Sequence, residues 1–503
     1  MIPAYSSPTP PVKYHNQQNI KEVNYKTDLE IQNIKILLTN FAEISEIYRE
    51  SGHCDEISKY LSKRLNKLDF TVKVKPDGTI IASRGLNKEK NNAIILQAHM
   101  DIVAESTNKD PKTPIKFIFK DGWLYAKGRT LGADNGIGVA AALIIAEDPM
   151  FKNYPLEIII TTNEETTMKG ARLLTPKDFY GKYLINLDSE TLGVLTTGCA
   201  GITEYEVSEK IKTKTIKTNN YSKISISLTG AKGGHSASIS EGYLNPIKVL
   251  LNLLTTKDYK VMSINGGDKF NTVPTEAQLE IIVPTTQAET TQKNINKYLS
   301  AIKNKNLIEN PNLNYKISIS SIKSGTKYIE PKIQKKLLKN INSIPTGLLS
   351  KYKDTGLNKT SQNLGQLTII DEKCTIKIME RSSDKKENKE VQIKTQNILS
   401  GAFNKAIKPT TTTPIWESKS SSELEKIATN AYSKVTNNGK SISRIEHGGL
   451  ESAIFADKCP NVEQISIGPT IKEPHSVREK VNVSTILPFY NWLSKILEEL
   501  KNK

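Results

Sequence analysis

Apolar residues recur along the chain at spacings typical of helices and strands. In residues 28–50 and 54–68 they return every three or four positions, which predicts two amphipathic helices. Residues 70–74 and 79–83 flank the turn-forming pair Asp77-Gly78 and predict a β-hairpin. The amino-terminal part of the chain is therefore expected to combine helices with strands.

Three longer apolar runs predict buried strands. They cover residues 94–104, 156–161 and 183–187. Between the first two, residues 132–143 combine glycines with small apolar residues and predict a loop that opens a buried helix. A nucleotide-binding glycine loop is the rival interpretation, but the GxGxxG pattern is absent. Strands alternating with a helix indicate an α/β sheet, whose functional groups gather at the carboxyl ends of the strands.

Each of these runs leads into residues that bind metals or move protons. His99 and Asp101 share one face if the first strand continues, and the carboxylate can then fix the tautomer of the imidazole. Alone, this pair also fits a packed core histidine or a base. The adjacent carboxylates Glu164 and Glu165 repel each other unless a cation compensates them, and Asp188 adds a further carboxylate. Together these residues favour a metal site.

A second histidine occurs near the C-terminus. Residues 462–467 predict another buried strand, and the polar loop that follows contains His475. Carboxylate oxygens with imidazole nitrogens suit zinc, manganese or cobalt, and one shared carboxylate can hold two ions. His53 precedes a predicted helix, where we interpret it as a solvated residue.

Length and composition restrict the class of protein. A chain of 503 residues exceeds the usual size of a single core, so two domains are expected. The net charge is +17, but the lysines are scattered, which favours a role in solubility and argues against nucleic acid as a partner. The four cysteines include no CxxC pair and indicate a reducing compartment without a disulfide framework.

The amino-terminal segment has neither a signal peptide nor a membrane span. Residues 1–27 contain several prolines but no apolar core, and no other stretch is apolar over the length that a membrane span requires. We expect a cytoplasmic protein with no membrane partner and a poorly ordered leader over residues 1–27.

Seven motifs, in this order and spacing, resemble those of the aminoacyl-histidine dipeptidases. This is the bacterial branch of the co-catalytic metallopeptidases that also includes carnosinases and tripeptidases. The resemblance runs from about residue 28 to the C-terminus. The motifs are LQAHMDIV, LGADNGIGVAAAL, TTNEETTMKGA, INLDSE, GGHSASIS, EHGGLES and GPTIKEPHSVRE.

The resemblance implies an α/β fold with two domains, a catalytic metallopeptidase domain and an inserted α+β lid domain. The catalytic domain would comprise residues 28–202 and 416–503, and the lid residues 203–415 in a longer, doubled form. Within the lid, alternating strand and helix patterns agree with this expectation. Residues 408–414 are predicted to be the return linker.

The same resemblance implies a ligand set for two divalent ions, with zinc expected and manganese or cobalt as alternatives. His99 and Asp188 would bind one ion. Glu165 and His475 would bind the other, and Asp134 would bridge them. The family also implies a cis peptide bond between Asp134 and Asn135.

For catalysis, the resemblance makes Glu164 the general base and Asp101 the residue that orients His99. His235 would stabilise the oxyanion, although a solvated, idle histidine in the glycine-rich loop is the alternative.

The resemblance also implies substrate contacts within the lid. Asn271 and Arg381 would grip the terminal carboxylate of the substrate, Arg381 through bidentate geometry. Thr275 stands where the family pattern has an arginine. His447 is expected either to contact substrate or to have a structural role.

The sequence therefore predicts a cytosolic metal-dependent dipeptidase with broad, Xaa-His-like specificity. The alternatives are an N-acyl amino acid amidohydrolase and a non-catalytic binding protein on the same scaffold. Two arrangements stay open: a homodimer in which His235 acts across subunits, and a monomer in which it acts within its own chain.

Overall fold

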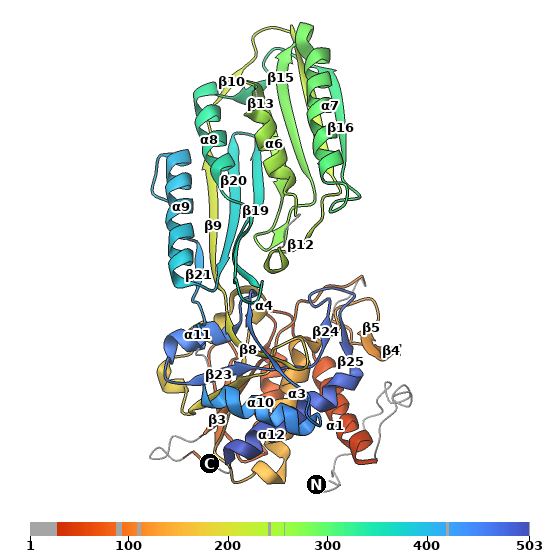
Figure 1. Cartoon of the computed structure of the whole chain (residues 1–503), viewed down its shortest axis with the longest axis vertical. Coiled ribbons are helices and arrows are strands. Elements are labelled where there is room, and N and C mark those ends of the chain that lie inside the picture. The colour runs from red at the N-terminus through yellow and green to blue at the C-terminus, as the bar shows by residue number, and fades with distance from the viewer. Residues whose placement is uncertain are drawn as a thin grey trace. The chain divides into compact units, whose positions relative to one another are not determined.

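The computed structural model describes residues 28–86, 93–107, 112–239, 243–255, 257–418 and 422–501. The predicted leader, residues 1–27, lies outside these residues. The chain divides into two compact units (Figure 1). The first unit comprises Met1–Cys199, Trp416–Glu446 and Leu450–Lys503, and the second comprises Ala200–Ile415 and His447–Gly449.

The first unit contains a mixed sheet of eight strands, in the order β1-β2-β6-β3-β7-β23-β8-β22. Its four neighbouring strands β6, β3, β7 and β23 run parallel. The strands are β1 (Thr71–Val74), β2 (Ile80–Arg84), β3 (Ile94–His99), β6 (Leu156–Thr161), β7 (Tyr183–Asn186), β8 (Val194–Cys199), β22 (Ile442–Glu446) and β23 (Glu463–Ser466). The predicted hairpin and buried strands are confirmed, and β3 ends at His99, earlier than expected.

Helices cover both faces of this sheet, which explains why its strands are apolar without alternation. Ile94 and Leu96 of β3 pack in one core, whereas Ile95 between them packs in another. The first core includes α1 (Asp28–Ser45), α2 (Asp55–Asn66), α3 (Ala133–Glu147), α10 (Glu423–Val435) and α12 (Val483–Lys501). The other core includes α5 (Lys169–Leu173) and α11 (Glu451–Lys458). A four-residue helix, α4 (Glu164–Thr167), follows β6.

A small sheet in the first unit holds the C-terminal polar loop. Its strands lie in the order β24-β25-β5-β4. They are β4 (Phe117–Lys120), β5 (Trp123–Ala126), β24 (Ile471–Lys472) and β25 (Lys480–Asn482). His475 lies in the loop between β24 and β25, so this sheet fixes both ends of the loop that carries it.

The second unit contains an antiparallel sheet in the order β16-β11-β15-β13-β19-β20-β9-β21, with β18 added beside β19. Its strands are β9 (Gly201–Lys210), β11 (Tyr221–Thr229), β13 (Lys260–Gly267), β15 (Ala277–Pro284), β16 (Asn314–Ser321), β18 (Gly347–Lys351), β19 (Asn358–Ile370), β20 (Lys373–Ser382) and β21 (Thr411–Thr413). The short pairs are β10 (Thr213–Thr215) with β17 (Lys327–Ile329), and β12 (Gly234–His235) with β14 (Thr272–Val273). β21 lies in the predicted return linker and extends the sheet edge.

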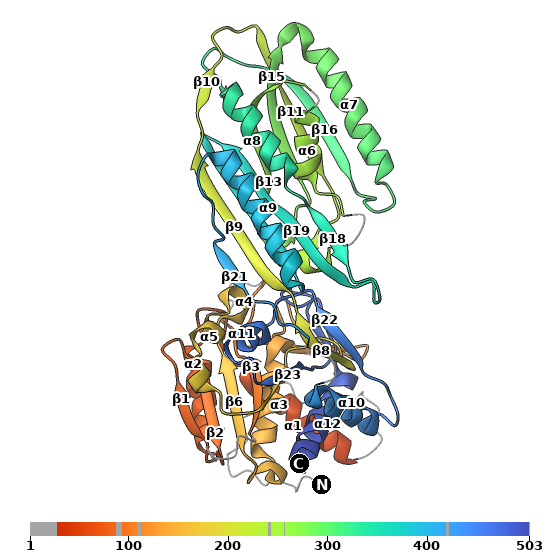
Figure 2. The same ribbon diagram turned by 60° about the vertical axis from the view of Figure 1, so that its left-hand side comes forward.

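Four helices pack against one face of this sheet (Figure 2). They are α6 (Pro246–Leu254), α7 (Ala288–Lys305), α8 (Pro331–Ser343) and α9 (Lys385–Phe403). In β11, Ile224, Ile226 and Leu228 are buried, whereas the intervening serines are half-buried. This alternation is typical of an antiparallel sheet with one covered face.

The strand order shows that the second unit is built twice. If the strands of each half are numbered 1 to 4 in chain order, the half with β11, β13, β15 and β16 has the spatial order 4-1-3-2 from its outer edge. The half with β9, β19, β20 and β21 continues the sheet as 2-3-1-4, which is the same order when it is followed from the opposite edge. Each half has two helices, and the halves meet at the antiparallel pair β13 and β19. The α/β class with an inserted α+β domain is thus confirmed.

None of the described helices combines the length and apolar character that a membrane span requires.

We predict that Ile160→Ala lowers the free energy of unfolding of the first unit by about 2–5 kcal/mol, because the side chain is fully buried in β6. Ile442→Ala is the control, since Ile442 is 67% exposed on β22 and should change stability by no more than about 0.5 kcal/mol. Tryptophan fluorescence during urea unfolding measures this unit, because all 3 tryptophans lie in it. Equal effects of the two substitutions would contradict the core described here.

Candidate metal centre and its surroundings

The carboxyl edge of the parallel strands brings two imidazoles together with several carboxylates. His99 Nε2 lies 3.0 Å from Asp134 Oδ1 and 3.2 Å from Asp188 Oδ1. His475 Nε2 lies 2.7 Å from Glu165 Oε2 and 3.2 Å from Asp134 Oδ2. Within each of these two trios, the donor atoms lie within 4.8 Å of one another. Asp134 therefore directs one oxygen toward each imidazole.

The adjacent glutamates after β6 point toward different histidines. Glu164 Oε2 lies 3.9 Å from His99 Nε2, while Glu165 contacts His475. The Glu165 side chain is 3% exposed and that of Glu164 is 12% exposed, whereas that of His475 is 44% exposed. The site is thus closed on the sheet side and open to solvent beside His475.

Burial and mutual repulsion disturb the protonation of these carboxyl groups. Burial raises the pKa of Glu164 well above its usual range and that of Glu165 to about 7. Burial also acts to raise the pKa of Asp134, but hydrogen bonds with His475 and His99 outweigh it and hold that pKa below its ordinary value. Burial likewise raises the pKa of Asp188.

The charges of this cluster do not balance within the protein. The four carboxyl groups of Asp134, Glu164, Glu165 and Asp188 can carry more negative charge than two protonated imidazoles can offset. Hydrogen bonds with Asp134 and Glu165 outweigh burial and raise the pKa of His475 to about 12, which shows how strongly the cluster attracts positive charge. Imidazole nitrogens and carboxylate oxygens in two such trios fit divalent cations.

Close backbone approach explains the glycines around Asp134. The Asp134–Asn135 peptide bond is cis, in agreement with the family resemblance. The Asn135 amide donates to the backbone oxygen of Leu187 at 3.0 Å and also contacts Asp188. A Cβ atom at Gly138 would lie 2.6 Å from the Leu187 oxygen, so only glycine permits this approach of α3 to the end of β7.

The Asp101 carboxylate, which is predicted to orient His99, also contacts the backbone after β6. His99 Nδ1 lies 3.1 Å from the backbone oxygen of Asp101 but 3.7 Å from its carboxylate. Because β3 ends at His99, strand alternation no longer directs the Asp101 side chain. Its two oxygens accept hydrogen bonds from the backbone N–H groups of Glu164 at 3.0 Å and Glu165 at 3.2 Å, and from the Ser51 hydroxyl at 2.6 Å. Asp101 therefore fixes the backbone that carries the two glutamates.

The remaining predicted residues gather in the second unit. Arg381 is 3% exposed and donates from Nε to Ser236 Oγ at 3.3 Å. The Ser236 N–H donates to the backbone oxygen of Asn271 at 2.7 Å, and the neighbouring His235 is exposed on β12. The Asn271 side chain is also exposed. These residues thus lie on adjoining segments of one unit.

His447 also packs in the second unit, together with Gly448 and Gly449, although the chain on both sides of these three residues belongs to the first. Its Nε2 lies 2.8 Å from Ser361 Oγ, and Ser361 pairs across the sheet with Arg381. Burial, together with the Arg381 charge, lowers the pKa of His447 to about 4. The imidazole is therefore neutral near pH 7, and its contacts fit both of the expected alternatives.

Sequence patterns did not assign a role to several buried charged residues beside the metal centre. Glu451 accepts hydrogen bonds from Gln97 Nε2 and Thr161 Oγ1, both at 2.6 Å, and burial raises its pKa to about 8. Glu451 lies in the motif EHGGLES and Glu479 in the motif GPTIKEPHSVRE. Their short distance in sequence from His447 and His475 was therefore the signal that could have identified them. Arg49 stands in no motif, and only its tertiary contacts distinguish it.

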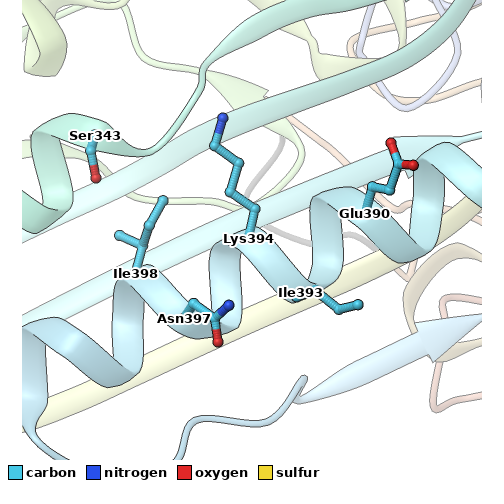
Figure 3. A pocket seen from close by; sticks show the side chains of 6 residues that line it. All are labelled: Ser343, Glu390, Ile393, Lys394, Asn397 and Ile398. Atoms are coloured by element: carbon cyan, nitrogen blue, oxygen red, sulfur yellow. The ribbon is translucent and has the colours of Figure 1, made fainter.

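A separate pocket of about 530 Å³ lies between α8 and α9 in the second unit (Figure 3). Its lining combines aliphatic with polar side chains and includes none of the predicted site residues. The residues that line the pocket are Ser343, Glu390, Ile393, Lys394, Asn397 and Ile398.

The fold and the two trios of donors define a class of protein that comparison identifies. Residues 95–499 match the model of Peptidase family M20/M25/M40, so the chain belongs to this family of peptidases. The expected family resemblance is confirmed.

Individual relatives are similar over nearly the full chain. The cytosol non-specific dipeptidase of Escherichia coli is 29% identical, covering 92% of this chain and 97% of that protein. The crystal structure of aminoacylhistidine dipeptidase from Vibrio alginolyticus superposes with a TM-score of 0.75 at 27% identity, covering 92% of this chain and 96% of that one. An aminopeptidase structure from Bacillus cereus, at 16% identity and a TM-score of 0.53 over 93% of this chain and 99% of that one, shares the fold.

Proposed function

We propose that this protein is a cytoplasmic dipeptidase that uses two divalent metal ions, with zinc as the expected metal. The observation that carries the proposal is Asp134, whose two carboxylate oxygens point to different imidazoles 3.0 and 3.2 Å away. Support for the reaction comes from the dipeptidases to which the chain is similar over 92% of its length.

The two trios of donors supply the proposed ligands. His99 and Asp188 would hold one ion, Glu165 and His475 the other, and Asp134 would bridge them. When bound, two such ions polarise the scissile carbonyl and lower the proton affinity of an attacking water.

Glu164 is the proposed general base. Its carboxylate lies beside the proposed ligands, 3.9 Å from His99 Nε2, and its own backbone is held by Asp101. It would take a proton from water and return that proton to the leaving amine. Burial raises the pKa of the Glu164 carboxyl group, which is the direction that suits a general base.

The second unit would supply the substrate contacts. Arg381 and Asn271 would bind the terminal carboxylate of a dipeptide, and His447 would line the same region beside Ser361. His235, exposed on β12, would donate a hydrogen bond to the oxyanion. A reaction that uses both units requires the second to close over the metal centre, within one chain or across a homodimer.

Metal analysis combined with a substrate comparison tests this function. We expect about two divalent ions per chain and hydrolysis of dipeptides, including Xaa-His dipeptides, that a chelator abolishes and added metal restores. Rapid hydrolysis of N-acetyl amino acids without dipeptide turnover would instead favour an amidohydrolase. Protein that binds no metal and hydrolyses neither substrate would contradict an enzymatic function.

We predict that the adjacent glutamates have separable functions. Glu164→Gln should lower kcat by roughly 10²–10⁴-fold while both ions stay bound, because only proton transfer is lost. Glu165→Gln should weaken the binding of one ion, because its oxygen lies 2.7 Å from His475 Nε2 in the second trio. Turnover assays and metal titrations on both variants measure the two effects. A Glu164→Gln protein with most of its activity would refute the assignment of the base.

We also predict a strong preference for a free carboxylate on the substrate. Arg381→Ala should reduce this preference by roughly 1.5–3 kcal/mol, the value of a charged hydrogen bond. The measurement is the ratio of kcat/KM for a dipeptide and its C-terminal amide, because a general loss of stability affects both substrates equally. Arg444→Ala, at a residue of the first unit, is the control. Equal cleavage of dipeptide and amide by the unchanged protein would contradict the carboxylate contact.

A further inference from the structure

Two buried charged side chains beside the metal centre take no part in the proposed chemistry. Arg49 is 0% exposed and Glu479 is 1% exposed. Arg49 follows α1, and Glu479 lies in the loop between β24 and β25, four residues after His475. A buried charge is costly unless several hydrogen bonds compensate it, so the partners of these side chains indicate what they do.

Glu479 binds the backbone that leads into Asp134. Its Oε2 accepts from the Gly132 N–H at 2.8 Å, and its Oε1 accepts from the Asp134 N–H at 3.1 Å. Each carboxylate oxygen thus holds one N–H group. The loop that carries His475 is thereby tied directly to the turn that carries the bridging carboxylate.

Arg49 binds the same turn from its other side. Its Nη2 donates to the Gly132 backbone oxygen at 2.7 Å, and its Nη1 donates to that of Met100 at 3.0 Å. Met100 follows His99 in the chain. Gly132 has a φ of +71°, and a Cβ atom there would lie 2.7 Å from Arg49 Nη2, so this contact requires glycine.

We infer that Arg49 and Glu479 form a clamp on Gly132 that positions three ligand-bearing segments of the proposed metal centre. The inference rests on the proposed function, because it assumes that Asp134, His99 and His475 bind metal. The N–H and the carbonyl of Gly132 are both held by buried charges, one linked to the His475 loop and the other to the His99 strand end. Arg49 and Glu479 act through the backbone and touch neither metal nor substrate.

Glu479→Gln isolates this effect, because glutamine keeps the shape of the side chain but offers one accepting oxygen in place of two. Its NH₂ group would face a backbone N–H, so one of the two contacts with the turn is lost. We expect the affinity for at least one ion to fall by roughly 10- to 100-fold, as found for residues that orient metal ligands.

Glu157→Gln is a matched control within the same unit. Glu157 is 0% exposed, and its carboxylate also accepts two backbone N–H groups, from Tyr180 at 3.0 Å and Gly181 at 3.2 Å. It is the second residue of β6, whereas Glu164 and Glu165 follow the other end of that strand. Both N–H groups contact the same oxygen, Oε2, so glutamine can keep both contacts while it removes a buried carboxylate, and metal affinity should not change.

The full-length protein and both variants would be stripped of metal and titrated with Zn²⁺ against a chromophoric chelator. Circular dichroism would confirm that each protein is folded at the titration temperature. We expect weaker binding for Glu479→Gln and unchanged binding for Glu157→Gln. Arg49→Lys keeps the charge but cannot reach the carbonyls of both Met100 and Gly132 with one planar group, so its metal affinity should also fall. This variant replaces Glu479→Gln in the test if Glu479→Gln does not fold.

Equal affinities of the unchanged protein and the Glu479→Gln variant would overturn the clamp and leave the dipeptidase proposal intact. An equal loss of affinity in Glu157→Gln would also overturn the clamp, because general destabilisation would then explain the effect. An unchanged protein that binds no Zn²⁺ would overturn both the clamp and the proposed metal centre.

Discussion

The first unit has to offset the repulsion among carboxylates that lie together at one edge of its sheet. Asp134, Glu164, Glu165 and Asp188 lie close together and largely buried, with two imidazoles between them. Such a group persists only if the surrounding backbone holds it in place. Neighbouring carboxyl groups supply that restraint: Asp101 holds the backbone of Glu164 and Glu165, and Glu479 holds that of Asp134. The charged residues at the centre are thus supported by further charged residues behind them.

The sequence predicts the central strands well because helices cover both of their faces. Every residue of β3 and β6 is buried, so both strands are mainly apolar without alternation, with Gln97 and Glu157 as buried polar exceptions. The family motifs add the identity of the residues that meet at this edge. Asp134 lies 35 positions after His99 and 341 positions before His475, yet both imidazoles lie within hydrogen-bonding distance of it, as the motifs imply.

The contacts behind these residues could not be predicted in the same way. The position of Asp101 two residues after His99 indicated a contact between their side chains, but not the shorter hydrogen bonds that the Asp101 carboxylate accepts from the backbone of α4. The contact between Arg49 and the Gly132 carbonyl joins residues 83 positions apart through a backbone atom, which leaves no pattern in residue type. Sequence spacing reports on side chains that share a face, whereas these contacts depend on how loops from different elements meet.

The repeated strand order of the second unit has a consequence for how its two halves can diverge. His235 and Asn271 belong to the half built on β11 to β16, whereas Ser361 and Arg381 belong to β19 and β20 in the other half. Two copies within one polypeptide can accumulate substitutions independently, unlike two identical subunits, in which every substitution occurs twice. Selection can therefore change residues near His235 in one half while those near Arg381 in the other half stay the same.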